Sequence, residues 1–484
     1  MNARTRFLGV LSVFLVTALC ACDRGLTEVN VDPNAPTDVG PEYFLPTAIT
    51  WAVGGVHGGW LMLNMTEIWS QQLVQLQYPV QEKGDVRPDK IQGFWDGFYL
   101  DVLTDIQTVV TKGQASGKGK IEGVGLTWRT WVFQQITDIW GDVPYSEALR
   151  ASEGITAPVY DPQQDIYTGM LQDLSDAVDR LSSGSGSFGS GDVLYDNDFG
   201  KWRRFANSLR MRLAMRLSEV DPATARSQFA AAYQAGAFES NDDNAVLRWP
   251  GAPYRNPVFD WCNTYQMNGV SATMIDTLKS LGDPRLALYA EPAAQDGEYR
   301  GLGNGIVNPP LLLSSYSRPG RFWTEGATTP SPIMTYAEAL LLEAEAAARG
   351  WISADPATLY EAGIRASMHQ YDPWSPANEP TDAEIDAYLA EPRVVYDAAT
   401  GLDQIHLQQW LALYMNGPEA WFNWRRTDVP HLQAGPDLTL PRIPIRFTYP
   451  DLEQSLNKAN LEAAVARQGG GLDLMTTPVW WDVR

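Results

Sequence analysis

Cysteine and histidine are scarce in this chain of 484 residues, which contains three cysteines and four histidines. Two of the cysteines, Cys20 and Cys22, lie close to the N-terminus, so Cys262 stands alone in the rest of the chain. A disulfide framework is therefore excluded, and the fold must be stabilised by burial of apolar side chains. The four histidines are scattered, without the spacing of a metal site or a catalytic triad.

Basic residues are also few, with 36 Lys and Arg against 58 Asp and Glu. Removal of residues 1–21 would take away Arg4 and Arg6 and no acid, which leaves 34 basic and 58 acidic residues and a net charge of −24. Nucleic acids need basic surfaces to neutralise their phosphates, so they are excluded as partners. The same charge argues against docking on an anionic membrane surface.

Enzyme motifs are missing as well. The sequence has no H-E-x-x-H zinc motif and no G-x-S-x-G nucleophile elbow. The stretch GSGSFG at 184–189 formally matches G-x-G-x-x-G, but it lies in a Ser/Gly-rich segment with no strand before it. A dinucleotide site needs that strand, so the match carries no function.

One apolar run is present, from Phe7 to Ala21, and it is shorter than the ~20 residues that a membrane-spanning helix needs. Arg4 and Arg6 precede it, which is typical of an export signal. Leu19-Cys20-Ala21-Cys22 then matches the bacterial lipobox. We therefore predict a lipoprotein signal peptide over 1–21, lipid attachment at Cys22, and membrane attachment through that lipid.

Two other readings of the N-terminus remain open. One is a generic secretory signal with incidental cysteines. The other is a CxC metal site, which is disfavoured because no further ligands stand nearby. The polar segment that follows, rich in Pro, Asn and Asp, predicts a tether over 22–40.

The rest of the chain shows helical periodicity, and the predicted helices come in pairs. The four pairs are 123–140 with 165–181, 202–220 with 222–235, 335–351 with 356–371, and 403–415 with 417–427. Small residues such as Ala344 and Gly363 permit close approach within the third pair. Such pairs are typical of tetratricopeptide-type units, although the full repeat consensus is not matched. An ordinary helical domain is the alternative.

Long stretches without this periodicity lie between the pairs and are rich in aromatic residues. Residues 247–271 contain two Trp, two Tyr, a Phe and three Pro, and residues 297–332 are similar. We predict that both stretches are irregular and functional. Trp and Tyr rings suit stacking on the C–H faces of sugars, with polar neighbours for the hydroxyls. The alternative for any one ring is that it packs inward over the helices.

Several motifs along the chain resemble the SusD/RagB family of outer-membrane nutrient-binding lipoproteins. They include NVDPNAPTDVGPEYFLPTA, DIWGDVPYSEAL, KWRRFANSLRMRLAMRL, PIMTYAEALLLEAEAAARG, NGPEAWFNWRRT and TTPVWWD, and they extend over nearly the whole mature chain. The resemblance implies a mostly α-helical single domain over 41–484, with four tetratricopeptide-like helix pairs and an irregular, aromatic-rich ligand face. It also supports Cys22 as the anchor.

The resemblance implies capture of a nutrient, most often an oligosaccharide and in some members a peptide. It implies delivery to a SusC-like TonB-dependent barrel in the outer membrane, with no catalysis and no cofactor. The residues available for ligand binding in the corresponding regions are Trp69, Tyr78, Asp85, Arg87, Tyr254, Trp261, Asn263, Tyr265 and Trp323. In contrast, Trp421, Trp424, Arg425 and Arg426 in the tail are predicted to lock the last helix onto the body.

Two further functions remain as alternatives. A lipid-anchored glycoside hydrolase needs only two suitably placed carboxylates, and 58 acids can supply such a pair. A helical-repeat scaffold that binds only protein is the other alternative, and the aromatic-rich loops argue against it. The sequence alone assigns no metal site and no particular ligand.

Overall fold

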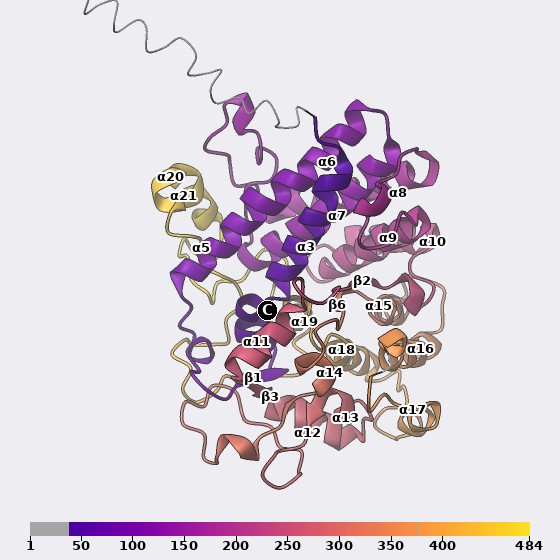
Figure 1. Ribbon diagram of the computed structural model, residues 1–484, viewed down its shortest axis with the longest axis vertical. Helices are drawn as coiled ribbons and strands as arrows, with labels where there is room; N and C mark the ends of the chain where they lie inside the picture. The colour runs from indigo at the N-terminus through magenta and orange to yellow at the C-terminus, as the bar shows by residue number, and fades with distance from the viewer. Residues whose placement is uncertain (1–37, 375) are drawn as a thin grey trace, which may run out of the picture. The chain divides into compact units, whose positions relative to one another are not determined.

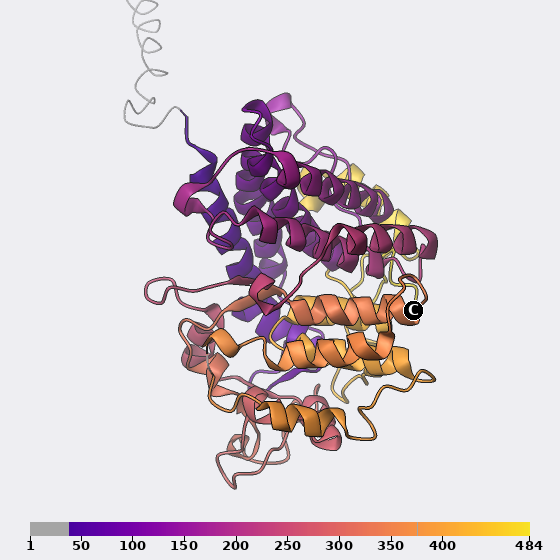
Figure 2. The same cartoon turned by 90° about the vertical axis from the view of Figure 1, so that its right-hand side faces the viewer.

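The protein is mostly helical in the computed structural model, and several of its helices stack in pairs (Figures 1 and 2). The structure describes residues 38–374 and 376–484, and Pro41–Arg484 form one compact unit. Cys22 and the predicted signal peptide lie outside the described residues, so those assignments stay predictions. No helix within the described ranges has the length and apolar character needed to cross a bilayer.

The four predicted helix pairs are confirmed, and the two helices of each pair pack against each other. In chain order they are α7 (Gly119–Trp140) with α8 (Gln163–Ser183), α9 (Phe199–Arg216) with α10 (Pro222–Ala235), α15 (Tyr336–Ala348) with α16 (Pro356–Met368), and α18 (Gly401–Ala412) with α19 (Gly417–Thr427). Figure 2 shows helices of successive pairs lying in rows one above another.

Local sequence signals set several of these boundaries. Helix α10 begins where the Asp221 carboxylate accepts a hydrogen bond from the backbone N–H of Thr224, with Pro222 at the first helical position. It ends at Gly236, whose φ of 94° few other residues adopt. In the third pair, a Cβ atom on Gly363 would lie 2.8 Å from the Leu341 side chain. The predicted close approach of α15 and α16 therefore depends on glycine at this position.

The N-terminal helices were not delimited by the sequence patterns. They are α3 (Pro41–Val56), the π-helical η1 (Gly59–Thr66), α4 (Glu67–Trp69), η2 (Gln81–Lys83), α5 (Pro88–Asp96), the π-helical η3 (Gly97–Leu103) and α6 (Thr104–Ala115). Elements α5, η3 and α6 follow one another without a break, so one long helical wall runs from Pro88 to Ala115. Helix α3 packs against η3, α6 and α7.

The remaining helices are short and lie mainly between the pairs and in the tail. They are α11 (Pro257–Tyr265), α12 (Ala272–Leu281), α13 (Leu286–Tyr289), α14 (Arg321–Thr324), α17 (Asp382–Leu389), α20 (Glu453–Leu456), α21 (Lys458–Arg467), and the single turns η4 (Ala151–Glu153), η5 (Gly189–Gly191), η6 (Asn241–Asp243), η7 (Leu313–Ser315) and η8 (Asp372–Trp374).

Three antiparallel strand pairs tie distant segments together. They are β1 (Leu73–Gln75) with β3 (Asn268–Val270), β2 (Ala245–Leu247) with β6 (Ser331–Met334), and β4 (Ala290–Glu291) with β5 (Arg318–Pro319). Strand β3 and helix α11 both lie within residues 247–271, so the expectation that this whole stretch is irregular is wrong. The Asn256 side chain caps α11 and Pro257 starts it, which is a helix signal inside an aromatic-rich segment.

Buried ion pairs join the helix pairs through α19. Arg216 on α9 lies 2.5 Å from Glu419, and Arg426 on α19 lies 2.7 Å from Glu345 on α15. Burial raises the pKa of the Glu345 carboxyl, but the nearby Arg426 and His406 outweigh burial and hold it well below its usual value. Each pair is buried, so removal of one partner would leave an isolated charge in the core.

The C-terminal lock, defined here as Trp421, Arg425, Phe447 and Trp481, closes the core. The Arg425 guanidinium lies 4.1 Å from the Trp421 ring and 4.6 Å from the Trp481 ring, and it donates a hydrogen bond to the Asp138 carbonyl. Trp421 donates to the Pro444 carbonyl at 2.9 Å. All four residues are buried, together with Trp424 and Arg426, which places the tail residues where the sequence predicts them.

Candidate ligand-binding site

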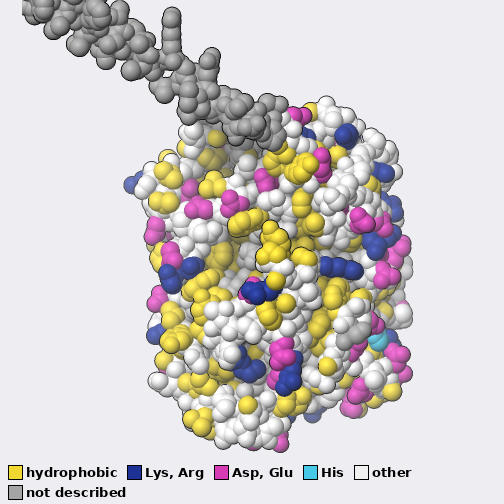
Figure 3. All heavy atoms as spheres, viewed as in Figure 1, with side chains coloured by type: hydrophobic (Ala, Val, Ile, Leu, Met, Phe, Trp, Pro, Cys, Tyr) yellow, Lys and Arg dark blue, Asp and Glu magenta, His cyan; other side chains and the backbone are white. Residues whose placement is uncertain are grey.

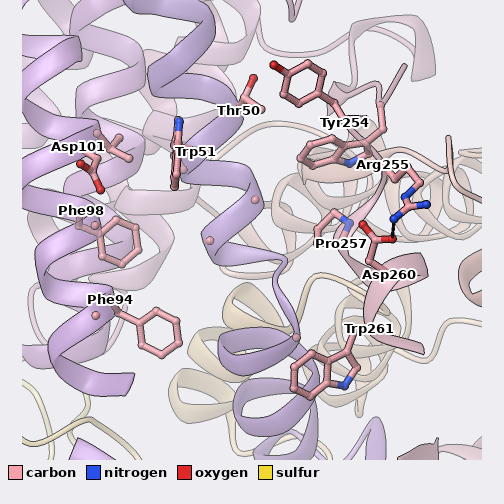
Figure 4. Close-up of a pocket in the computed structure, with 18 of the residues that line it drawn as sticks. Thr50, Trp51, Phe94, Phe98, Asp101, Tyr254, Arg255, Pro257, Asp260 and Trp261 are labelled. Carbon is pink, nitrogen blue, oxygen red and sulfur yellow. Dashed lines mark ion pairs between the residues drawn. The ribbon is translucent and has the colours of Figure 1, made fainter. Parts of the chain in front are cut away.

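A cleft of about 1010 Å³ opens between three segments that are far apart in the sequence. Its floor is the C-terminal half of α3, one wall is α5 with η3, and the other wall is residues 249–265 (Figure 4). In the space-filling view, hydrophobic side chains gather around the upper centre of the face that carries α3 (Figure 3). We call this depression the ligand cleft.

Helix α3 buries one face against the body and exposes the opposite face, which forms the floor of the cleft. The helix buries Leu45, Ala48, Ile49, Ala52, Val53 and Val56 against the body. Trp51 lies outside that apolar face and is 63% exposed, although it is the largest side chain of the helix. Gly55, one turn later, also lines the cleft, and a Cβ atom there would meet no other atom within 4 Å. An indole ring therefore stands beside bare backbone.

The α5–η3 wall combines aromatic rings with glycine. Pro88 starts α5, and Phe94 and Phe98 lie on the cleft side (Figure 4). Gly93 and Gly97 also line the cleft, and a Cβ atom on either would meet nothing within 4 Å. Glycines one helical turn apart leave a flat strip of backbone that a ligand can approach closely.

The opposite wall is held in place by hydrogen bonds from buried tryptophans. Trp249 donates its indole N–H to Ser331 Oγ at 2.9 Å, and Trp261 donates to Asn268 Oδ1 at 3.2 Å. The Trp261 ring fits against Gly59, where a Cβ atom would lie only 2.0 Å from the ring. The indoles are thus fixed, and they form the inner part of this wall.

Two tyrosines on the same wall have free faces. Tyr254 is 64% exposed and Tyr265 is 52% exposed, and both line the cleft. The Tyr265 ring centroid lies 4.4 Å from that of Trp261, so the buried indole supports the exposed phenol ring. Figure 4 places Tyr254 across the cleft from Trp51.

Acidic side chains outnumber basic side chains in the cleft. Asp96, Asp101 and Asp260 line it, against one guanidinium, that of Arg255. Arg255 pairs with Asp260 at 2.7 Å, as the dashed line in Figure 4 shows. Asp105 follows Asp101 by one turn, and its pKa is raised by partial burial and by the Asp101 charge. The α5–η3 side of the cleft is therefore acidic.

Rigid aromatic faces, bare backbone and a few polar groups make a site for a ligand with flat apolar faces and polar edges. Sugar rings have that character, since their C–H faces stack on aromatic rings and their hydroxyls need hydrogen-bond partners. Within the described ranges, no group of three or more His, Cys, Asp and Glu residues could hold a metal ion.

Comparison with known families identifies the chain. Residues 57–450 match a model of SusD-like proteins described as starch-binding and associating with the outer membrane. This chain belongs to the SusD-like family. The matched range contains all four helix pairs and most of the ligand cleft. A comparison with curated protein sequences found no match.

Solved structures of SusD homologues share the fold of this SusD-like protein. A chitin-binding protein is 31% identical, with a TM-score of 0.84 over 92% of this chain and 100% of that one. A chitin-binding SusD homologue from Flavobacterium johnsoniae is 26% identical, with a TM-score of 0.78 over 91% and 99%. A SusD homologue from Bacteroides fragilis, at 23% identity and a TM-score of 0.79 over 92% and 99%, supports the fold alone.

The structure of this SusD-like protein brings three of the predicted ligand residues together. Tyr254, Trp261 and Tyr265 all line the ligand cleft. Asn263 lies on the same helix but faces elsewhere, donating to the backbone carbonyls of Phe259 and Thr324 and lining a different depression.

Three other predicted residues are exposed but do not line the cleft. Tyr78 and Asp85 lie on the loop before α5. Arg87 binds the Asp89 carboxylate with two hydrogen bonds of 2.9 and 2.8 Å, and its guanidinium lies 5.5 Å from the Trp60 ring. The exposure of these residues leaves them available to a ligand that extends beyond the cleft.

Trp69 and Trp323 have no face available to a ligand. Trp69 is 3% exposed and packs against Trp421 and Phe447 of the C-terminal lock. Trp323 is 1% exposed and packs against Tyr371 and Tyr414. Stacking on a ligand by either ring would require the core to open, so we do not propose them as ligand residues.

The sequence reasoning missed Trp51, the aromatic pair Phe94 and Phe98, and Asp101. Trp51 could have been found from its position, because a tryptophan outside the apolar stripe of an amphipathic helix has no core to enter. The α5–η3 residues carried no comparable signal, since the π-helical turn changes which side chains share a face.

Proposed function

We propose that this SusD-like protein is a cell-surface lipoprotein that captures an oligosaccharide in the ligand cleft and passes it to a SusC-like TonB-dependent transporter. The observation that carries the proposal is the exposed aromatic surface of the cleft. Trp51 comes from the floor and Tyr254 and Tyr265 from one wall, and each of the three rings is largely exposed to solvent. Exposed large rings that converge on one hollow are a feature of ligand sites.

The chemistry of the cleft favours a carbohydrate over a purely apolar ligand. Rings are interleaved with carboxylates, one guanidinium and the open backbone of Gly55, Gly93 and Gly97, so the cleft offers both polar and apolar contacts. A buried sugar hydroxyl must be paired, and this arrangement offers partners for it. Because two similar solved proteins are described as chitin-binding, we propose β-linked N-acetylglucosamine oligomers as the first ligands to test.

Attachment and delivery form the second half of the proposal. The family description places these proteins in association with the outer membrane. The lipobox that ends at Cys22 supplies an anchor of suitable strength once that residue is lipidated. A lipid-tethered binder held beside a barrel would raise the local concentration of ligand at the transporter entrance.

Isothermal titration calorimetry against a panel of neutral oligosaccharides, with product analysis of each mixture, tests capture. We expect saturable binding of at least one oligosaccharide, with the ligand recovered intact. Recovery of shortened products would contradict capture and favour the glycoside hydrolase. Failure of every oligosaccharide, combined with co-purification of a barrel protein, would favour the protein-binding scaffold.

Metabolic labelling with a fatty acid tests the anchor. The wild-type protein should take up label and fractionate with the outer membrane, and a Cys22→Ala variant should do neither. Uptake of label by the Cys22→Ala protein would overturn the assignment. Isolation of the labelled protein under mild detergent should bring a TonB-dependent barrel with it.

A further inference from the structure

The charge of the ligand cleft is concentrated on one side. On the 249–265 wall, Arg255 is committed to Asp260, so that pair contributes little net charge. On the α5–η3 side, Asp101 is exposed, and within the described ranges it has no hydrogen-bond or ion-pair partner. The carboxylates that line the cleft therefore outnumber its one guanidinium by two, and Asp101 is one of the two without a basic partner.

The two helices that carry Trp51 and Asp101 contain no basic side chain. Helix α3 and η3 contain no Lys, Arg or His. Arg87 and Lys90, at the start of the α5 wall, lie over the Trp60 ring and pair with Asp89. The next acidic group, Asp105, adds to the negative charge, and its raised pKa reflects burial and the Asp101 carboxylate.

An exposed indole ring faces the same space. Figure 4 shows the Trp51 ring and the Asp101 carboxylate at the same level of the cleft, on two helices that pack against each other. A carboxylate with an electron-rich ring beside it is a pair of groups that binds a cation attached to an apolar ring, by ion pairing and by cation–π attraction. It repels an anionic ligand for the same reason.

We propose that the ligand cleft prefers a glycan carrying protonated amino groups, that is, a partly deacetylated amino-sugar chain, with Asp101 as the residue that determines this preference. The inference rests on the proposed function, since it names the substrate class of the same cleft. A sugar ring that stacks on Trp51 presents its substituents at the edge of the ring, within reach of the α5–η3 wall. Uronic-acid and sulfated glycans are disfavoured by the same carboxylate.

The size of the preference for an amino-bearing glycan follows from the solvent exposure of Asp101 and Trp51. A solvent-accessible ion pair contributes a factor of about two to five, and a cation–π contact contributes a similar factor. We therefore expect the amino-bearing ligand to bind about five- to tenfold more tightly than the neutral one. The preference should shrink as salt is added, because screening weakens exposed charges.

The test is calorimetric titration of the full chain with two oligomers of equal length, one N-acetylated and one deacetylated, at low salt and at a pH where the amines are protonated. Four proteins are compared: wild type, Asp101→Asn, Asp276→Asn and Trp51→Ala. Asp276 is an exposed acid on α12 outside the cleft, so it controls for net charge. Asn keeps the shape of Asp101 and removes its charge.

The expected result is a five- to tenfold preference for the deacetylated oligomer in wild type and in Asp276→Asn, reduced in Asp101→Asn to the factor of about two to five that the cation–π contact supplies. Trp51→Ala should weaken both ligands. Equal affinities in wild type, or a preference as large in Asp101→Asn as in wild type, would overturn the inference while leaving capture intact. Binding of neither oligomer would count against the proposed chitin-type ligand and would overturn this inference with it.

Discussion

The C-terminal lock and the ligand cleft are built from the same residue types and differ in what surrounds the rings. In the lock, the Trp421 and Trp481 rings both contact the Arg425 guanidinium, and both indole N–H groups donate to acceptors in the core. In the cleft, the rings of Trp51 and Tyr254 adjoin glycine backbone and solvent. Aromatic content alone therefore does not locate a ligand surface, and the neighbours of each ring decide its role.

The largest expected effect is in the lock. Trp421→Ala should lower the free energy of unfolding by about 3–5 kcal/mol, because it leaves a cavity the size of an indole and removes the ring beneath Arg425. Trp421→Phe should lose less, since a phenyl ring fills part of the space. Chemical denaturation measures both. A loss below about 1 kcal/mol in the Ala variant would show that the lock does not hold the fold together.

The same logic applies to Trp323, which sequence reasoning assigned to the ligand surface. Because this ring is buried against Tyr371 and Tyr414, Trp323→Ala should destabilise the fold by an amount similar to Trp421→Ala. Its ligand affinity, measured on the fraction that folds, should match wild type. Loss of affinity with unchanged stability would return Trp323 to the ligand surface.

Acidification should affect stability through His57, a buried residue just after α3. Burial lowers its pKa from the ordinary 6.5 to about 4, so the folded protein holds it neutral where the unfolded chain would protonate it. The unfolded state then binds more protons between these values, and stability falls as the pH falls. Relative to His57→Asn, wild type should lose about 3 kcal/mol between pH 6.5 and 4. Parallel stability profiles of the two proteins would contradict this account.

A smaller free-energy change is expected in the cleft, where it should appear in binding and leave folding unchanged. Trp51→Ala should weaken oligosaccharide binding tenfold or more, about 1.4 kcal/mol, with unfolding free energy within about 0.5 kcal/mol of wild type. Tyr43→Ala is a matched control, because Tyr43 is on the same helix, is 67% exposed and does not line the cleft. Equal losses of affinity in the two variants would show that Trp51 has no special role.

The smallest effect is expected at Gly93. Gly93→Ala adds one methyl group to the cleft wall without touching another atom, so affinity should fall only a few-fold. The same change should stabilise the helix by about 0.5–1 kcal/mol, because glycine is a poor helix former. Calorimetry should thus show a lower affinity for this variant, and thermal unfolding should show a higher stability. Unchanged affinity would place the ligand away from the α5–η3 wall.

Much of the fold could be predicted because its signals are local. Helices α10 and α19 have the predicted boundaries, since a capping residue or a proline at the first turn determines where each begins. The tail residues were also placed correctly, because tryptophan and arginine repeat at helical spacing there. Helix α11 was missed because its nine residues lie within a segment dominated by proline and aromatic residues.

The site could be predicted only in part because the cleft is assembled from three distant segments. Tyr254, Trp261 and Tyr265 lie within one stretch and were found together, whereas Trp51 and Asp101 reach the cleft only through the packing of α3 against η3. Trp69 and Trp51 are 18 residues apart, yet one is buried and the other is exposed. The difference in burial between these two rings comes from long-range contacts, which cannot be predicted from the local sequence.

A crystal structure of the full chain with a bound N-acetylglucosamine oligomer tests the central claim most directly. The cleft between α3, the α5–η3 wall and residues 249–265 should contain the sugar, with rings stacked on Trp51 and on Tyr254 or Tyr265. A second depression of about 900 Å³, between α6, residues 144–158 and α20, offers a clear alternative location. Sugar bound there, with the aromatic cleft empty, would contradict the account.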